Sequence, residues 1–156
     1  MEKDWSLSAL IKMLSSVFFI GYSRFFPGTL ASLAAFLIYI FLIRGNYALH
    51  LICVLTAVIL GSWISGKAEK LFKRKDAPQI VIDDFSGMLA ALLFLPYGLR
   101  IGWLGFIVFR LFDVFKPYPI SKIEKLSGSW GVMGDDLLAA LYTNITLQLF
   151  LKLTCA

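Results

Sequence analysis

The sequence predicts an all-α fold, a multi-helical membrane bundle of about five apolar helices preceded by an amphipathic N-terminal helix. Of its 156 residues, 59% are hydrophobic and 16% are charged, whereas soluble domains are roughly 45–50% apolar. The mean hydropathy of +0.79 supports the same class. The apolar residues form runs of helical length between short polar turns, without a repeat or a linker. We therefore expect a single domain over residues 1–156.

The first two expected elements are an amphipathic helix and an apolar helix. Residues 5–20 carry an apolar stripe at helical spacing, with serines and Lys12 elsewhere, which is typical of a helix that lies at a membrane interface or packs on the bundle. A turn at Pro27-Gly28 follows, and Thr29 is the expected N-cap of a helix that runs to Ile43. Free N–H groups at such a start favour an anion, although ordinary capping explains the turn equally well.

Four further apolar runs complete the expected bundle. They cover residues 47–64, the segment from Asp83 to about Tyr97, residues 101–115, and the segment from Asp135 to about Leu153. The two middle runs are short for a full membrane span of about 20 residues. His50 has no second histidine or paired cysteine, so we expect an interfacial side chain there and not a metal ligand.

A cluster of basic residues sets the expected orientation. It lies in the polar segment 65–79 and consists of Lys67, Lys70, Lys73, Arg74 and Lys75. Excess Lys and Arg marks the cytoplasmic loops of membrane proteins, where they meet anionic lipid. No groove-reading motif accompanies the cluster, so we expect no nucleic-acid partner. If the apolar runs cross the membrane in alternating directions, four other polar segments lie at the same cytoplasmic face. They are Pro27-Gly28-Thr29, Asp83-Asp84, the end of the run 101–115 and Asp135-Asp136.

The most informative stretch runs from Phe109 to Pro119. It places Arg110, Asp113 and Lys116 three residues apart, so that they share one helix face. The helix should end near Lys116, because a residue before proline is pushed out of the α region. A structural ion pair explains these charges as well as a functional site does. The functional interpretation gains weight from acid pairs that open two other apolar runs, Asp83-Asp84 and Asp135-Asp136.

The chemistry expected of these charges is metal-assisted phosphoryl transfer. Several carboxylates close together cannot all stay ionised without a cation. Mg²⁺ prefers such oxygen ligands and leaves room for water and phosphate, and arginine and lysine suit phosphate oxygens. A cysteine phosphatase is excluded because Ile59 stands where Cys53 would need an arginine. A membrane transporter with an acidic ion path and a lipid-binding structural subunit remain as alternatives.

Four segments of the chain resemble the phosphatidylglycerophosphatase A family. They are Pro27-Gly28-Thr29 with Ser32, Ile82-Asp83-Asp84-Phe85 with Gly87, Phe109 to Ile120, and Gly131 with Asp135-Asp136. The chain departs from the family at Asp84, where glutamate is usual, and at Ala31, where glycine is usual. The resemblance implies an all-helical, Mg²⁺-dependent phosphatase. Such an enzyme removes the terminal phosphate of phosphatidylglycerophosphate to give phosphatidylglycerol at the cytoplasmic leaflet of the cell (inner) membrane.

On these grounds we predict the roles of nine residues. The predicted metal ligands are Asp83, Asp84, Asp113, Asp135 and Asp136. The predicted substrate-binding residues are Thr29, Ser32, Arg110 and Lys116. The predicted catalytic residues are Asp83, Asp84, Asp113, Lys116 and Asp136. Direct attack by water and a phospho-aspartate intermediate both remain open.

Overall fold

The computed structural model describes residues 2–75, 77–126 and 128–154, and in these residues the chain is all-helical, without a strand. The helices are α1 (Glu2–Ser15), α2 (Pro27–Ile38), α3 (Tyr47–Phe72), α4 (Ile82–Ala91), α5 (Leu99–Phe115), α6 (Ile120–Ile123) and α7 (Ser129–Thr154). A 3-10 turn, η1 (Ile20–Tyr22), precedes α2, and a π-helical turn, η2 (Tyr39–Ile43), continues it. The predicted all-α fold is confirmed.

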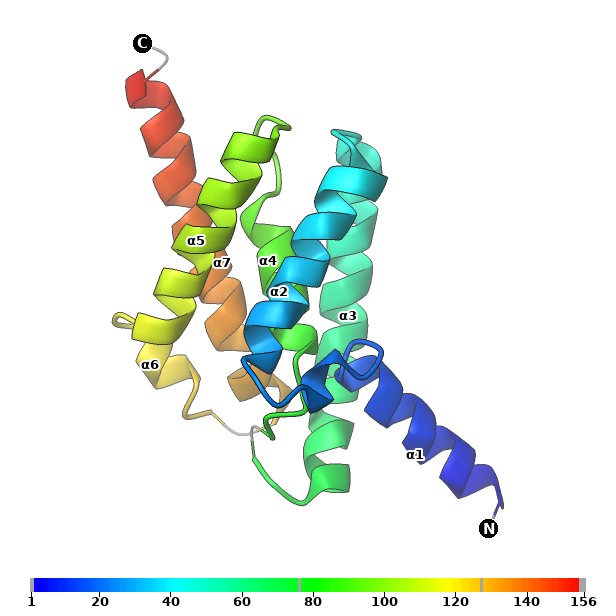
Figure 1. The fold of residues 1–156 in the computed structure, drawn as a ribbon. Coiled ribbons are helices and arrows are strands. Elements are labelled where there is room, and N and C mark those ends of the chain that lie inside the picture. Colours follow the sequence, from blue (N-terminus) through cyan, green and yellow to red (C-terminus); the bar gives the residue numbers. More distant parts are fainter. Residues whose placement is uncertain (1, 76, 127, 155–156) are drawn as a thin grey trace.

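The short helix α4 lies at the centre of the bundle. Helices α2, α3, α5 and α7 pack around it, and α1 projects from the side (Figure 1). The main core contains Phe36 of α2, Met88 and Leu89 of α4, and Phe109 of α5. Gly87 lets three helices approach closely, because a Cβ there would lie 2.8 Å from the Phe109 ring and 3.1 Å from the Asp136 carbonyl oxygen. Close packing at Gly87 therefore holds α4 against the parts of α5 and α7 that carry charged residues.

Two helices begin earlier than their sequences predict. The expected N-cap at Thr29 is wrong, since Phe26 is the N-cap and Pro27 is the first residue of α2. The fixed φ of proline suits the first helical position, where its missing N–H costs nothing. Helix α7 begins at Ser129, so Asp135-Asp136 lie in its second turn and do not open it. Burial of Gly131 outweighs the low helix propensity of glycine.

Two other helices end at different places from those expected. Helix α4 stops at Ala91, well before Tyr97. Pro96 disfavours the α region at the residue before it, and Phe94 has a left-handed φ of 61°. Helix α3 continues past residue 64, where its apolar run was expected to end, to Phe72. Helix α5 ends at Phe115 with Lys116 as its C-cap, as predicted.

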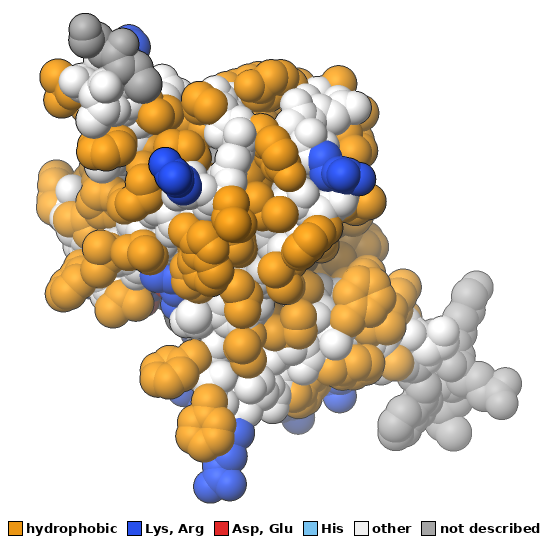
Figure 2. Space-filling model, turned by 45° about the horizontal axis from the view of Figure 1, so that its top comes forward, with side chains coloured by type: hydrophobic (Ala, Val, Ile, Leu, Met, Phe, Trp, Pro, Cys, Tyr) orange, Lys and Arg blue, Asp and Glu red, His pale blue; other side chains and the backbone are white. Residues whose placement is uncertain are grey.

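The expected count of about five apolar helices is not confirmed, and fewer helices than that are long enough to span a membrane. In the described parts of the chain, two helices, α3 and α7, are long and apolar enough to cross a membrane, and each has 26 residues. Helix α4 has only 10 residues, roughly 15 Å of helix against a bilayer core of about 30 Å. Hydrophobic side chains nevertheless cover most of the surface seen in Figure 2.

His50 is buried, and the expected interfacial position is wrong. Only 2% of its surface is exposed. Its Nε2 atom lies 2.9 Å from the Leu89 carbonyl oxygen, and its ring packs beside Tyr39. His50 therefore joins α3 to α4 inside the bundle.

Candidate functional site

One pocket, which we call the acidic pocket, collects most of the predicted site residues. It lies at the end of the bundle where α2, α4 and α7 begin and α5 ends (Figure 1). Its volume is about 330 Å³. Of the predicted residues, its walls contain Thr29, Asp83, Asp84, Arg110, Asp113, Lys116, Asp135 and Asp136. Segments from four separate parts of the chain thus meet in a single cavity.

Three of the five predicted acids form a compact triad. Asp83 and Asp84 lie in the first turn of α4 and Asp136 lies in α7. One carboxylate oxygen from each lies within 4.8 Å of the other two. The Asp84 N–H donates to Asp83 Oδ1 at 2.9 Å, and the positive end of the α4 dipole favours both carboxylates. Three converging carboxylate oxygens are the ligands that hard divalent cations prefer.

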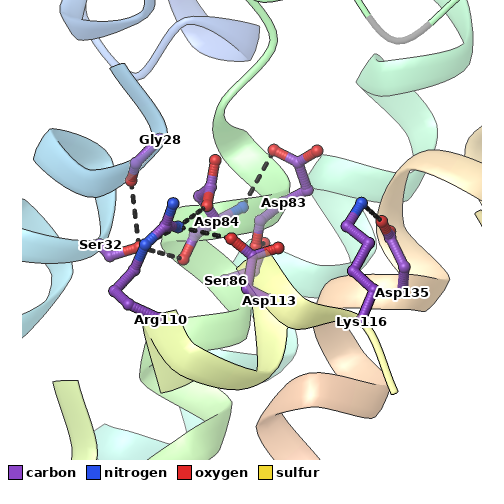
Figure 3. Close-up of polar contacts among 9 residues, drawn as sticks. All are labelled: Gly28, Ser32, Asp83, Asp84, Ser86, Arg110, Asp113, Lys116 and Asp135. Atoms are coloured by element: carbon purple, nitrogen blue, oxygen red, sulfur yellow. Dashed lines mark hydrogen bonds and ion pairs between the residues drawn. The ribbon is translucent and has the colours of Figure 1, made fainter. Parts of the chain in front are cut away.

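Arg110 ties the triad to α5. Its Nη1 nitrogen donates to Asp84 Oδ1 and lies 2.9 Å from Asp113 Oδ2 (Figure 3). The same nitrogen is 3.3 Å from Ser32 Oγ. Ser32 is fully buried, and its hydroxyl donates to the Gly28 carbonyl oxygen at 3.1 Å. The structure thus places Ser32 behind Arg110, where it orients the guanidinium, and not on the pocket wall.

Lys116 pairs with Asp135, away from the triad. Its Nζ lies 2.8 Å from Asp135 Oδ2 and 2.9 Å from Glu124 Oε1. Burial lowers the pKa of Lys116, but these two carboxylates outweigh that effect and leave it above its ordinary value. Glu124 was not predicted as a site residue. Nothing in its local sequence marks it, because its contact with Lys116 depends on how the chain turns through α6.

Gly28 allows α2 to begin directly against Asp84. A Cβ at this position would lie 2.9 Å from Asp84 Oδ1 and closer still to Oδ2. Any side chain there would displace the carboxylate. The Pro27-Gly28-Thr29 turn therefore forms part of the pocket wall, and Thr29 lies in the first turn of α2.

The acidic pocket has more carboxylates than bases, an excess that a bound cation could balance. Five carboxylates line it against two bases, Arg110 and Lys116. Burial raises the pKa of Asp84 to about 7, although the Arg110 guanidinium lowers it; Asp113 and Asp135 raise it further. Asp135 Oδ1 is buried and has no hydrogen-bond partner among the residues that the structure describes. An excess of carboxylates with an unused oxygen among them fits a divalent cation, whose charge would relieve the repulsion.

A protein-family model and three named relatives match most of the chain. Residues 13–151 match the family model described as Phosphatidylglycerophosphatase A. A protein of that name from Haemophilus influenzae is 34% identical over 147 residues, which cover 92% of this chain and 90% of the relative. One from Escherichia coli is 32% identical over 122 residues, or 76% of this chain and 70% of the relative.

A third relative carries a different substrate in its name. It comes from Bacteroides thetaiotaomicron and is provisionally named a phosphatidylinositol-3-phosphatase. It is 34% identical over 146 residues, which cover 88% of this chain and 91% of its own length. No solved structure matches the chain. The chain belongs to the phosphatidylglycerophosphatase A family, a family of phosphatases.

Proposed function

We propose that the chain is a Mg²⁺-dependent lipid phosphatase that converts phosphatidylglycerophosphate to phosphatidylglycerol at the cytoplasmic face of the cell (inner) membrane. The observation that carries the proposal is the Asp83, Asp84 and Asp136 triad, which shares one pocket with Arg110 and Lys116. Cation ligands and phosphate-binding bases in one cavity are what phosphomonoester hydrolysis needs. The names of the Haemophilus influenzae and Escherichia coli relatives support this substrate.

The triad would hold the Mg²⁺ ion, which supplies charge neutralisation at the phosphate oxygens and a more acidic bound water. Arg110 presents a planar guanidinium that suits two phosphate oxygens at once, and Lys116 adds a second positive charge across the pocket. On substrate binding, these bases exchange part of their contact with carboxylates for contact with phosphate. Thr29, in the first turn of α2, would add a hydroxyl donor.

Asp113 and Asp135 would act beside the triad. Asp113 contacts Arg110 and lines the pocket, so it can bind the cation or accept a proton from the attacking water. Asp135 positions Lys116 through one oxygen and keeps the other for a ligand. Acid quenching of a reaction with ³²P-labelled substrate separates the two chemical routes, because a phospho-aspartate would retain the label on the protein.

The outer surface supports a place in the membrane. In α3 only 28% of the apolar 18-residue stretch is buried inside the protein, and in α7 only 22%. A core helix of a soluble protein would be mostly buried. Large side chains such as Phe41, Ile59 and Leu153 are exposed, and apolar patches of this extent mark a membrane or partner surface. We propose a multi-pass protein whose basic segment 67–75 and acidic pocket face the cytoplasm.

A transporter is the weaker interpretation of the same acids. An ion path would place carboxylates near the middle of the membrane. Here the acids lie in the first turn of α4 and the second turn of α7, at one end of the bundle. This position suits a reaction at the headgroup level of a lipid.

The test is an assay of the purified full chain in detergent. Phosphate release is measured from phosphatidylglycerophosphate, phosphatidic acid and phosphatidylinositol 3-phosphate, with Mg²⁺ and with a chelator. We expect release from phosphatidylglycerophosphate that requires Mg²⁺ and exceeds release from the other two lipids. A preference for phosphatidylinositol 3-phosphate would instead support the activity named for the Bacteroides thetaiotaomicron relative. Mg²⁺-independent release, or none from any lipid phosphate, would contradict the proposal.

A further inference from the structure

We infer that an apolar groove on the outer face of α2 seats an acyl chain of the lipid substrate while the phosphate of that lipid lies in the acidic pocket. This inference rests on the proposed function. It assigns a binding site for the apolar part of the substrate, which the charged residues of the pocket cannot hold.

The groove lies between the turn that precedes α2 and the outer side of α2. Its volume is about 420 Å³, and its walls are mostly apolar. The turn contributes Phe19 and Tyr22, and α2 contributes Leu30, Leu33 and Leu37. Phe19 and Tyr22 pack against each other, with their ring centroids 6.0 Å apart. The groove is thus a shallow, open depression with an aromatic side and an aliphatic side.

The acidic pocket and the groove share the helix α2. Thr29 lines the pocket, and Leu33 and Leu37, one and two turns further along, line the groove. Residues four apart lie one above the other on a helix, so a single stripe passes from a polar residue to apolar ones. From Thr29 to Leu37 the stripe is roughly 12 Å long at 1.5 Å per residue. A lipid with a phosphate at one end and a hydrocarbon chain at the other matches this stripe, which is polar at Thr29 and apolar at Leu33 and Leu37.

Two exposed aromatic residues precede α2, the helix that the pocket and the groove share. Phe25 and Phe26 are 70% and 77% exposed, and Phe26 also lines the acidic pocket. Aromatic side chains are enriched at the level of lipid headgroups. They place the membrane interface at the pocket, so that an acyl chain entering the bilayer from there would run along α2.

A second apolar hollow lies between α1, α2, α3 and α4, and Cys53 and Leu60 are among its walls. Val81 lines the acidic pocket, whereas Val17 and Phe85 line the hollow, and these side chains pack together in one core cluster. A chain in that hollow would not connect to a phosphate in the pocket. The α2 groove is therefore the site for the substrate chain.

The kinetic test compares two substrates on three variants. Leu37→Gln and Leu33→Gln place a polar group in the groove, and Ile59→Gln makes the same kind of change on an outer face of α3 that lines neither hollow. We expect the groove variants to raise KM for long-chain phosphatidylglycerophosphate by about tenfold, because an apolar contact is lost. Their kcat/KM for the deacylated headgroup, glycerophosphoglycerophosphate, should match that of the wild type. Equal losses on both substrates, or KM values equal to those of Ile59→Gln, would overturn the inference.

A binding test separates failure of the groove from failure of the proposed function. Phosphatidylglycerol with a photoreactive diazirine in one acyl chain is crosslinked to the wild-type chain in detergent, and labelled peptides are identified by mass spectrometry. We expect labels in the stretches 19–22 and 30–37 that excess unlabelled phosphatidylglycerophosphate displaces. Labels concentrated around Cys53 and Leu60, or spread evenly over the outer helices, would overturn the inference. Specific labelling without phosphate release would contradict only the catalytic assignment.

Discussion

Arg110 on α5 binds Asp84 on α4 through Nη1, and Asp84 is also a member of the acidic triad. One carboxylate thus faces both the proposed cation site and a base suited to phosphate. The same nitrogen lies 2.9 Å from Asp113. In the proposed mechanism, binding of the cation and binding of the phosphate are therefore coupled through Asp84, and changes on either side of it should alter both.

Replacement of Arg110 by lysine should lower kcat/KM by about 100-fold or more, as removal of a donor to a developing charge does. Lysine carries a point charge and cannot contact two carboxylates and a phosphate with one planar group. Phosphate release measures the effect. Arg100→Lys, at the exposed start of α5, is the matched control and should keep wild-type activity. Full activity in Arg110→Lys would show that the guanidinium has no role in substrate binding.

The two neighbouring aspartates of α7 should differ when each is changed to asparagine. Asp136 belongs to the triad, so Asp136→Asn should lose activity that added Mg²⁺ does not restore. Asp135 pairs with Lys116, so Asp135→Asn should keep its Mg²⁺ requirement and raise KM for the lipid. Mg²⁺ titrations of phosphate release with both variants distinguish these outcomes. Identical behaviour of the two variants would mean that the triad is not a separate unit.

Gly28→Ala should reduce activity although it adds only one methyl group. The new Cβ would lie within 2.9 Å of Asp84 and would push that carboxylate away from Asp83 and Asp136. A loss of at least about tenfold follows if ligand geometry matters as it does around other bound metals. Gly98→Ala is the control, since in the described part of the chain no atom beyond its two neighbours lies within 4 Å of a Cβ there. Equal activity of the two variants would argue against close contact between α2 and Asp84.

The raised pKa of Asp84, which lies outside α3 and α7, predicts a pH dependence of cation binding. Below its pKa of about 7 the carboxyl holds a proton that the cation must displace. The Mg²⁺ concentration for half-maximal activity should therefore rise as pH falls from 8 to 6, by up to about tenfold for each pH unit below the pKa. Asp84→Asn, if enough activity remains to titrate, should lose this dependence. A constant Mg²⁺ requirement across this range would contradict the pKa.

The raised pKa of Asp84 should also make the stability of the cation-free protein depend on pH. The folded carboxyl binds its proton more tightly than the unfolded one, whose pKa is near 3.8. Stability in a chelator should therefore fall as pH rises from about 4 through 7, and Mg²⁺ should restore more of it at pH 8 than at pH 6. Thermal unfolding in detergent with and without chelator measures both changes. Greater stability at pH 8 than at pH 5 in the chelator would reverse the expected sign.

Local sequence patterns predicted the helices more reliably than their ends. Periodicity and the proline at 117 correctly placed the end of α5 at Lys116. The starts of α2 and α7 were missed, because Pro27 begins a helix where a turn was expected and packing of Gly131 extends α7. The burial of His50 was also missed, since its hydrogen bond to the Leu89 carbonyl oxygen depends on a helix 39 residues away.

The sequence also indicated which residues would meet, but not how they pair. Acid pairs at the starts of apolar runs suggested a shared face, and the structure brings Asp83, Asp84 and Asp136 together. Spacing could not show that Asp135 turns toward Lys116, because adjacent residues on a helix point in different directions. It also could not reveal Glu124, whose contact is made across the turn at α6.

Direct measurement of divalent-cation binding tests the central claim, that three aspartates from two distant segments hold one ion. Mn²⁺ serves as a spectroscopic substitute, and electron paramagnetic resonance counts free and bound ions in the purified wild-type chain and in Asp136→Asn. We expect saturable binding to the wild type, competition by Mg²⁺, and a loss of affinity of at least about tenfold in the variant. Equal affinity in both proteins would contradict the account, because the ion would then lie elsewhere.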